Sequence, residues 1–180
     1  VVDVWAYYNQ ADEVELFLNG RSLGIPKKSG DDLHVQWRVP FEAGTLKAVS
    51  RKDGQEVMVR EISTAGEPSQ MRVTADRTTL SAGGEDLSFI AIDILDKAGN
   101  LVPHASNRIS IQIEGDVYIA GVDNGSQTSH DPFKADWVKA FNGKCLVIVR
   151  SGKQAGKAQV RLSSVGMEDQ LVYFATSIST

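Results

Sequence analysis

The chain has 180 residues, of which 42% are hydrophobic and 23% charged, the balance of a folded globular protein rather than a disordered one. Its formal net charge of -4 at pH 7 argues against nucleic acid as a partner, because such binding normally uses a basic surface. No stretch approaches the ~20 consecutive apolar residues of a membrane-spanning helix, so no membrane span is expected.

The sequence opens on an apolar, strand-like segment without an initiator methionine or a signal-peptide pattern, which predicts that it was excised from a longer polypeptide. In this segment Trp5 and Tyr7 share one face of the expected strand, and Tyr8 lies on the other. Flat aromatic rings suit the apolar faces of sugars, so Trp5 and Tyr7 are candidate carbohydrate or domain contacts. Their position in an opening strand favours the alternative, a core or interface role.

Apolar residues recur at every second position in two segments of the first third of the chain. This spacing predicts strands with one buried face, and it places Trp37 in the core. Glu13 and Glu15 fall on the polar face of the first segment, so we interpret them as solvated charges and not as the facing acids of a glycosidase. The alternating residues are Val14, Leu16 and Leu18, followed by Val35, Trp37 and Val39.

The second part of the chain repeats this alternation around residues 109–114 and 159–163. Two continuous apolar runs, residues 89–95 and 146–149, predict strands covered on both faces. Cys145 borders the second run and is the single cysteine, so we expect a buried thiol without a disulfide or a nucleophilic role. Asp96 precedes a Gly-Asn pair and is suited to closing a β-turn through its own side chain.

Turn-forming pairs separate these strands at short intervals, and no segment has a sustained helical period. The Asn-Gly and Asp-Gly pairs predict tight hairpins between antiparallel neighbours. Small residues and a proline at positions 64–69 suggest a boundary. We therefore predict an all-β chain of two tandem immunoglobulin-like β-sandwich modules, residues 1–66 and 67–180, of which the first is small for a sandwich.

No constellation of residues predicts chemistry. There is no Gly-x-Ser-x-Gly elbow for a serine nucleophile, and no Gly-rich phosphate loop precedes a helix. His34, His104 and His130 are scattered without metal-binding spacing, so neither a metal nor any other cofactor is expected. The sequence accordingly predicts no catalytic residue.

The longest turn-rich segment spans residues 121–134 and is soon followed by Trp137. Loops of this length inside compact domains are often functional. Four interpretations remain open: a connection pinned by side-chain hydrogen bonds, a contact with another domain, a glycan contact, and a Ca²⁺ site formed by Asp123, Asn124 and Asp131. The candidate contact residues here are Asp123, Asn124, His130, Phe133 and Trp137.

Two motifs resemble a known family. The Val-Glu-Leu-Phe-Leu-Asn-Gly run at residues 14–20 resembles the first sandwich after the catalytic barrel of glycoside hydrolase family two β-galactosidases. Residues 121–143, with Gly-Val-Asp-Asn-Gly at their start and Ala-Phe-Asn-Gly at their end, resemble the last C-terminal sandwich of those enzymes. Ser126 and Gln127 stand where the family has Asp-Pro, so a family role for this loop does not carry over directly.

The resemblance implies that the parent protein is a retaining exo-β-glycosidase, most plausibly a β-galactosidase, acting on glycans in the periplasm or after secretion. The acid/base and nucleophile glutamates of the family belong to a (β/α)₈ barrel and have no matching positions here. The resemblance thus implies an accessory region that braces the missing catalytic barrel. Its partners would be that barrel and the upstream domains of the same polypeptide. Completing an oligomer interface and holding substrate nearby are further possible roles.

Two other functions compete with this one. A carbohydrate-binding module would use the aromatic side chains and the long loop already named, with a glycan as partner. An adhesin-like bacterial surface repeat is the second alternative, because residues 96–103 also resemble turns of invasin-type immunoglobulin modules.

Overall fold

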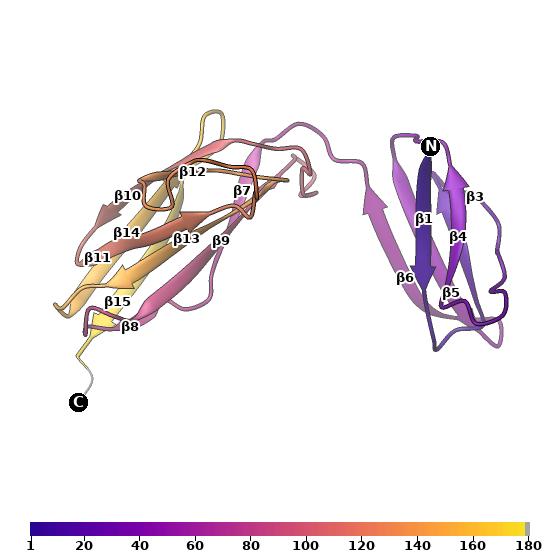
Figure 1. Ribbon diagram of the computed structural model, residues 1–180, viewed down its shortest axis with the longest axis horizontal. Helices are drawn as coiled ribbons and strands as arrows, with labels where there is room; N and C mark the ends of the chain where they lie inside the picture. Colours follow the sequence, from indigo (N-terminus) through magenta and orange to yellow (C-terminus); the bar gives the residue numbers. More distant parts are fainter. Residues whose placement is uncertain (179–180) are drawn as a thin grey trace. The chain divides into compact units, whose positions relative to one another are not determined.

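The computed structural model of the protein describes residues 1–178, which form strands joined by turns and loops (Figure 1). The predicted all-β class is confirmed, since no helix occurs in the described residues. None of them, therefore, forms a helix suited to crossing a membrane. The strands are β1 Val2–Tyr7, β2 Glu13–Leu18, β3 Arg21–Ser22, β4 His34–Val39, β5 Thr45–Lys52, β6 Gln55–Ser63, β7 Gln70–Ala75, β8 Thr79–Ser81, β9 Leu87–Leu95, β10 Arg108–Glu114, β11 Val117–Asp123, β12 Trp137–Lys139, β13 Lys144–Ser151, β14 Gly156–Ser163 and β15 Gln170–Ser177.

The chain divides into two compact units, which we call unit 1 (Val1–Thr64) and unit 2 (Ala65–Thr180). Each has its own cluster of buried apolar side chains.

Unit 1 packs two unequal sheets face to face. A two-stranded sheet, β1-β4, lies over a four-stranded sheet of order β3-β2-β5-β6. The core between them is built on Val14, Leu16, Val35 and Trp37, the last only 6% exposed, so the alternation correctly predicted the buried faces of β2 and β4. The indole N–H of Trp37 donates to the Gly24 carbonyl at 3.1 Å, which satisfies its polar edge.

Three of the four Asn-Gly and Asp-Gly pairs form two-residue hairpins as predicted, whereas the fourth, Asn124-Gly125, begins the long loop after β11. Asn19, Asp53 and Asn142 adopt φ values of 51°, 52° and 51°, and the glycine after each is also at positive φ. Two consecutive residues at positive φ define the type I′ turn, whose twist matches that of the strands it joins. The pairings Leu18 with Arg21 and Lys52 with Gln55 confirm the expected tight antiparallel connections.

Unit 2 is a larger sandwich of a five-stranded and a four-stranded sheet. Their orders are β12-β10-β14-β15-β8 and β11-β13-β9-β7 (Figure 1). Strand β15 lies between β14, to which it is antiparallel, and the short β8, to which it is parallel. The core includes Ile90, Ile92, Ile109, Val147 and Leu162, each at most 1% exposed.

The expectation that residues 89–95 are covered on both faces is wrong. On β9, Ile90, Ile92 and Ile94 point into the core, but Phe89 is 40% exposed and Ala91 is also exposed. The reason is that unit 2 has two layers, so each sheet retains an outer face. Apolar residues on that face produced a continuous hydrophobic run without producing burial.

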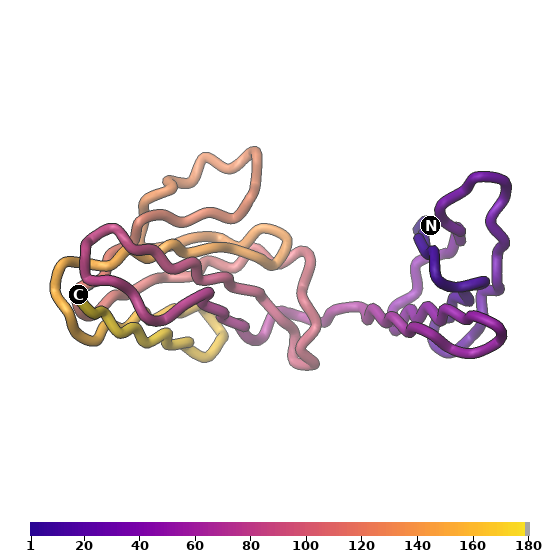
Figure 2. The backbone as a smooth tube through the Cα atoms, turned by 90° about the horizontal axis from the view of Figure 1, so that it is seen from below, coloured from indigo at the N-terminus to yellow at the C-terminus, as the bar shows by residue number. Residues whose placement is uncertain are grey.

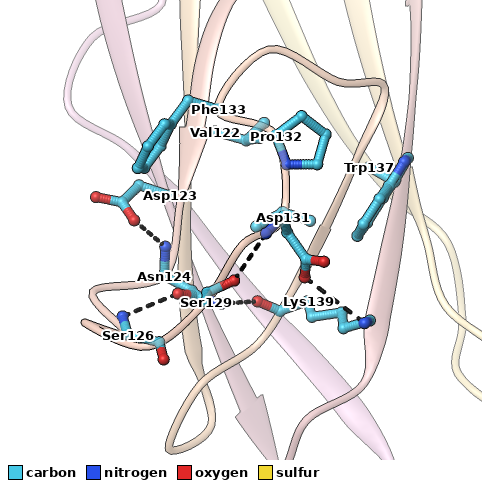
Figure 3. Close-up of a pocket in the computed structure, with 11 residues that line it drawn as sticks. Val122, Asp123, Asn124, Ser126, Ser129, Asp131, Pro132, Phe133, Trp137 and Lys139 are labelled. Atoms are coloured by element: carbon cyan, nitrogen blue, oxygen red, sulfur yellow. Dashed lines mark hydrogen bonds and ion pairs between the residues drawn. The ribbon is translucent and has the colours of Figure 1, made fainter.

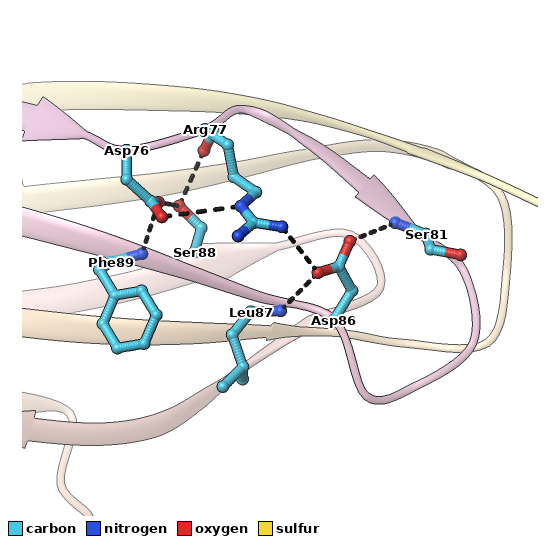
Figure 4. Close-up of polar contacts among 7 residues, drawn as sticks. All are labelled: Asp76, Arg77, Ser81, Asp86, Leu87, Ser88 and Phe89. Carbon is cyan, nitrogen blue, oxygen red and sulfur yellow. Dashed lines mark hydrogen bonds and ion pairs between the residues drawn. The ribbon is translucent and has the colours of Figure 1, made fainter.

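An ion-pair network fixes the ends of β7, β8 and β9 (Figure 4). Asp86 accepts the N–H of Ser81 at 2.8 Å and pairs with Arg77 at 3.2 Å. Asp76 accepts the Phe89 N–H at 2.8 Å and the hydroxyl of the fully buried Ser88 at 3.0 Å. The Phe89 N–H is the main reason that the pKa of Asp76 lies below its ordinary value.

Asp96 holds the first residues of unit 2 against the loop that follows β9, as its predicted turn role required. Its carboxylate accepts the N–H groups of Gly66, Ala98 and Asn100 at 2.8–2.9 Å and the Asn100 side-chain amide at 3.0 Å. The side chain is 5% exposed. The Gly66 N–H, followed by the Asn100 amide, lowers the pKa of Asp96 to about 2.

We predict that Asp96→Asn lowers the thermal midpoint of unfolding at pH 7, by on the order of 5 °C. In Asn the carboxylate oxygen that accepts from the Gly66 N–H and the Asn100 side-chain amide is replaced by an NH₂ group. Two of the present hydrogen bonds are therefore lost. The carboxyl titrates near 3.8 when unfolded and about 2 when folded, so its contribution is complete above about pH 4 and disappears as pH falls toward 2.

The measurement is thermal unfolding followed by circular dichroism between pH 2 and pH 7. Asp169→Asn is the matched control, because Asp169 makes a surface ion pair with Arg161 at 3.2 Å, a kind of pair that contributes little. The difference between wild type and Asp96→Asn should shrink at low pH. A difference that stays constant down to pH 2 would contradict this assignment.

Candidate functional site

The strongest candidate site is the long loop between β11 and β12, which doubles back along β11 (Figure 2). Strand β11 is at the edge of its sheet, and the Val122 N–H donates to the Phe133 carbonyl at 2.7 Å. The returning loop thus occupies part of an edge that would otherwise offer free backbone groups. We call residues 123–139 the β11–β12 loop site.

Four of the five residues that sequence analysis proposed here lie around one hollow: Asp123, Asn124, Phe133 and Trp137 (Figure 3). Asp131, proposed as a calcium ligand, also lines it. His130 is exposed on the loop and does not line the hollow. Lys139 completes the site from the end of β12.

The polar groups of the site bind one another. Asn124 donates its side-chain amide to the Lys139 carbonyl and accepts the Ser126 N–H, both at 2.9 Å. Asp123 accepts the Asn124 N–H at 2.7 Å, and Asp131 pairs with the Lys139 ammonium at 3.6 Å (Figure 3). This pattern favours the pinned-connection interpretation.

Cations lie near the ring of Trp137. The Arg108 guanidinium carbon lies 4.1 Å from its ring centroid and the Lys139 ammonium 5.7 Å away, both within the range of cation–π attraction. A sugar stacking on this indole would compete with these groups.

The hollow itself is too small for a sugar. Its volume is about 20 Å³, close to what a single water molecule needs, whereas small-molecule pockets are commonly hundreds of Å³. Phe133, 69% exposed, remains available to an outside partner. No cluster of three or more His, Cys, Asp or Glu side chains with metal-binding geometry occurs within residues 1–178. Glycan contact and calcium binding here stay untested predictions.

The second candidate group lies on the outer face of the β1-β4 sheet in unit 1. Trp5 and Tyr7 are 55% and 64% exposed, so the core part of the favoured expectation is wrong, whereas the interface part stays a prediction. The core-facing positions of β1 are Val4 and Ala6, because Trp5 and Tyr7 fall on the opposite side of the pleat. Tyr8 packs partly buried against the core.

His34, on β4, lies between the two aromatic rings. Its ring centroid is 5.0 Å from those of both Trp5 and Tyr7, with interplanar angles of 30° and 37°. At this separation the rings face one another and do not lie side by side in one plane. They therefore form a small exposed stack, not a flat platform for a chain of sugars.

The carboxylates that resemble catalytic acids are engaged in ion pairs. Glu15 accepts the Ser22 hydroxyl at 2.6 Å and the Arg51 guanidinium at 2.8 Å, which together lower its pKa. Asp93 is bound by Arg72 and Lys144, each at 2.6 Å. Burial raises the pKa of Asp93, but these two cations outweigh it, so the pKa is lowered. Ionised, paired carboxylates of this kind are poor proton donors.

Cys145 is buried, 6% exposed, as predicted for a core thiol. Burial, assisted by the charge of Asp93, raises its pKa to about 12. A protonated, enclosed thiol does not act as a nucleophile near neutral pH.

One exposed apolar surface was not predicted from the sequence. Strand β6 is exposed along all nine residues, including Val57, Met58 and Ile62. Apolar residues at every second position occur both on a strand face that is buried in a core and on one that is exposed. The sequence of this segment therefore could not show that β6 is exposed.

In these β-sandwiches Glu15 and Asp93 are paired with cations, an arrangement that suits a region without a reacting group. The family match agrees: residues 71–172 match the profile described as glycoside hydrolase family 2 C-terminal domain 5. Residues 1–58 match a domain of unknown function, DUF4982. The chain therefore belongs to glycoside hydrolase family 2, as part of its C-terminal, non-catalytic region.

Individual relatives extend this assignment over nearly the whole chain. A β-galactosidase of Bacteroides ovatus, BoGH2A, is 47% identical over 95% of the chain, which covers 20% of that protein. A putative β-glucuronidase of Formosa agariphila is 34% identical over 99% of the chain and 17% of its own length. The chain thus spans about a fifth of the length of these relatives.

Solved structures support the same fold. A glycosyl hydrolase family 2 member from Bacteroides cellulosilyticus superposes with a TM-score of 0.91 at 36% identity, covering 97% of this chain and 23% of that one. A β-glycosidase from Bacteroides vulgatus gives 0.84 at 30% identity, covering 97% and 22%.

Asn124 allows a test of the pinned-loop interpretation. Asn124→Ala removes one bond to Lys139 and one to Ser126, so we expect the free energy of unfolding of the chain to fall by about 1–2 kcal/mol. Hydrogen exchange of residues 125–133 should accelerate in the same variant. Ser126→Ala is the control, because the Ser126 hydroxyl makes one long contact of 3.5 Å to Thr128. Equal effects of the two substitutions would contradict the pinning role of Asn124.

Proposed function

We propose that this chain is the C-terminal accessory region of a β-galactosidase-type glycoside hydrolase and that it braces the catalytic (β/α)₈ barrel of the same polypeptide. The observation that carries the proposal is the 47% identity to a β-galactosidase of which the chain makes up a fifth. The remaining four-fifths of such a protein has room for the barrel and its acids.

The internal chemistry of the chain supports a mechanical role. Glu15 and Asp93 are held ionised by cations, and the thiol of Cys145 is enclosed. The loop site offers a volume of about 20 Å³, which favours bracing over substrate capture. A periplasmic or secreted location of the whole protein stays a prediction.

Removal of the chain from the full-length enzyme tests this function. We expect the truncated enzyme to lose activity on heating about tenfold faster than the full-length enzyme. The reason is that an interface between two domains slows the unfolding of both. The value of kcat/KM before heating should change by less than about threefold, because the chain supplies no reacting group. The readout is hydrolysis of a nitrophenyl β-galactoside after timed incubation at one temperature.

The isolated chain, assayed at the same molar concentration, should produce no nitrophenol above the uncatalysed background. Hydrolysis by the isolated chain would overturn the non-catalytic assignment. Unchanged heat inactivation of the truncated enzyme would overturn the bracing role.

A further inference from the structure

Exposed large apolar side chains are concentrated in unit 1. Eleven of the nineteen in the described residues lie within residues 1–64, although this unit is the smaller one. Clusters of exposed apolar side chains generally indicate a surface that contacts another molecule or domain. Those of unit 1 are Val1, Val2, Trp5, Tyr7, Ile25, Leu33, Phe41, Val57, Met58, Val59 and Ile62.

The unequal sheets of unit 1 explain part of this exposure. The core cluster draws residues from β1, β2, β4 and β5, but none of the described residues in it comes from β6. On β6, Met58 pairs with Ser50 and Ile62 with Leu46, which places both on the face that β5 turns toward the core. Met58 is nonetheless 50% exposed and Ile62 72% exposed. The two-stranded β1-β4 sheet is too narrow to pack against all four strands of the other sheet, so β6 is left without a packing partner in unit 1.

Two separate hollows lie between β1 and β6 on this open side, and we call the surface from one to the other the groove. At one end, a hollow of about 180 Å³ is bounded by Val2 and Val4 from β1 and by Ile62 from β6. At the other end, a hollow of about 600 Å³ lies between Tyr7 and Met58. Both ends of the groove are thus lined by the same two strands.

Both strands also carry a free backbone edge. Strand β6 is the last strand of its sheet and pairs with β5, while β1 pairs with β4. A long edge strand offers unpaired backbone groups to another chain, and proteins normally cover such an edge or interrupt it with charge. On β6 the charged residues are interspersed with apolar ones, so charge interrupts this edge only in part. The nine residues of β6 extend over roughly 30 Å.

We propose that the groove between β1 and β6 is the surface on which unit 1 receives an apolar segment of the catalytic part of the same polypeptide. This inference rests on the bracing function and names the surface that performs it. The family profile describes a C-terminal domain, so the remaining four-fifths of a relative such as BoGH2A lies mostly before the matched region. A polypeptide that precedes Val1 enters β1 directly, beside the hollow lined by Val2.

Covalent continuity favours this occupant over a second copy. A segment tethered next to the groove is present at a high effective concentration, so a modest apolar contact is enough to hold it. Intramolecular domain interfaces of this kind commonly bury about 600–1,500 Å². The mixture of apolar side chains with Glu56, Arg60 and Glu61 on β6 agrees with a contact that is more polar than a core.

The test compares one substitution in two contexts. Ile62→Glu and Met58→Glu place a charge in the groove, and Tyr173→Glu is the control at a strand position in unit 2 that is 63% exposed. In the isolated chain each variant should unfold within about 3 °C of the wild type, because these side chains are half or more exposed there. In the full-length enzyme, Ile62→Glu and Met58→Glu should accelerate heat inactivation about tenfold, whereas Tyr173→Glu should not.

Three results would overturn the proposal. Groove variants that destabilise the isolated chain as much as the full-length enzyme would show that the surface serves folding within the chain. Groove variants without effect in the full-length enzyme, when truncation still accelerates inactivation, would leave the bracing function standing and place it on another surface. An isolated chain that is dimeric by light scattering and becomes monomeric with Ile62→Glu would identify a second copy as the occupant.

Discussion

Everything in this chain depends on pairs of sheets that exclude water from the layer between them. Val14, Leu16 and Trp37 close that layer in unit 1, and residues such as Ile92 and Leu162 close it in unit 2. Burial of alternate side chains fixes which face of each strand points into that layer, and hence the register in which neighbouring strands pair. The small size of unit 1 limits how much of this layer it can enclose, and the exposure of β6 follows from that limit.

Polar groups in unit 2 are used to hold backbone in place. Asp96 gathers N–H groups around one carboxylate, Asp76 and Asp86 tie strand ends together, and Asn124 closes the long loop on Lys139. Hydrogen-bonded polar side chains of this kind add rigidity, and the carboxylates among them are poor proton donors because they are held ionised by their partners. Such a domain is well suited to transmitting mechanical support and poorly suited to exchanging protons with a substrate.

The fold was largely predictable because its signals are local. Alternation around Leu16 and Trp37 and the Asn19-Gly20 pair each report on a few neighbouring residues. The outward position of Trp5, the open face of β6 and the returning loop at Phe133 depend on what lies across the sandwich, which sequence spacing does not encode. Four of the loop residues named from the sequence line one hollow, but their surrounding hydrogen bonds, which leave little room for a ligand, could be seen only in the coordinates.

The place of β15 has a consequence for biosynthesis. This strand, residues 170–177, lies inside the five-stranded sheet, between β14 and β8, and carries the buried Phe174. The ribosome must synthesise β15 before that sheet is continuous, and the paired residues Thr79 and Ala175 are 96 positions apart in the sequence (175 − 79). Unit 2 is thus completed only after β15 has been synthesised, and nascent chains that stop short of this strand present an unfinished sheet to the quality-control machinery of the cell.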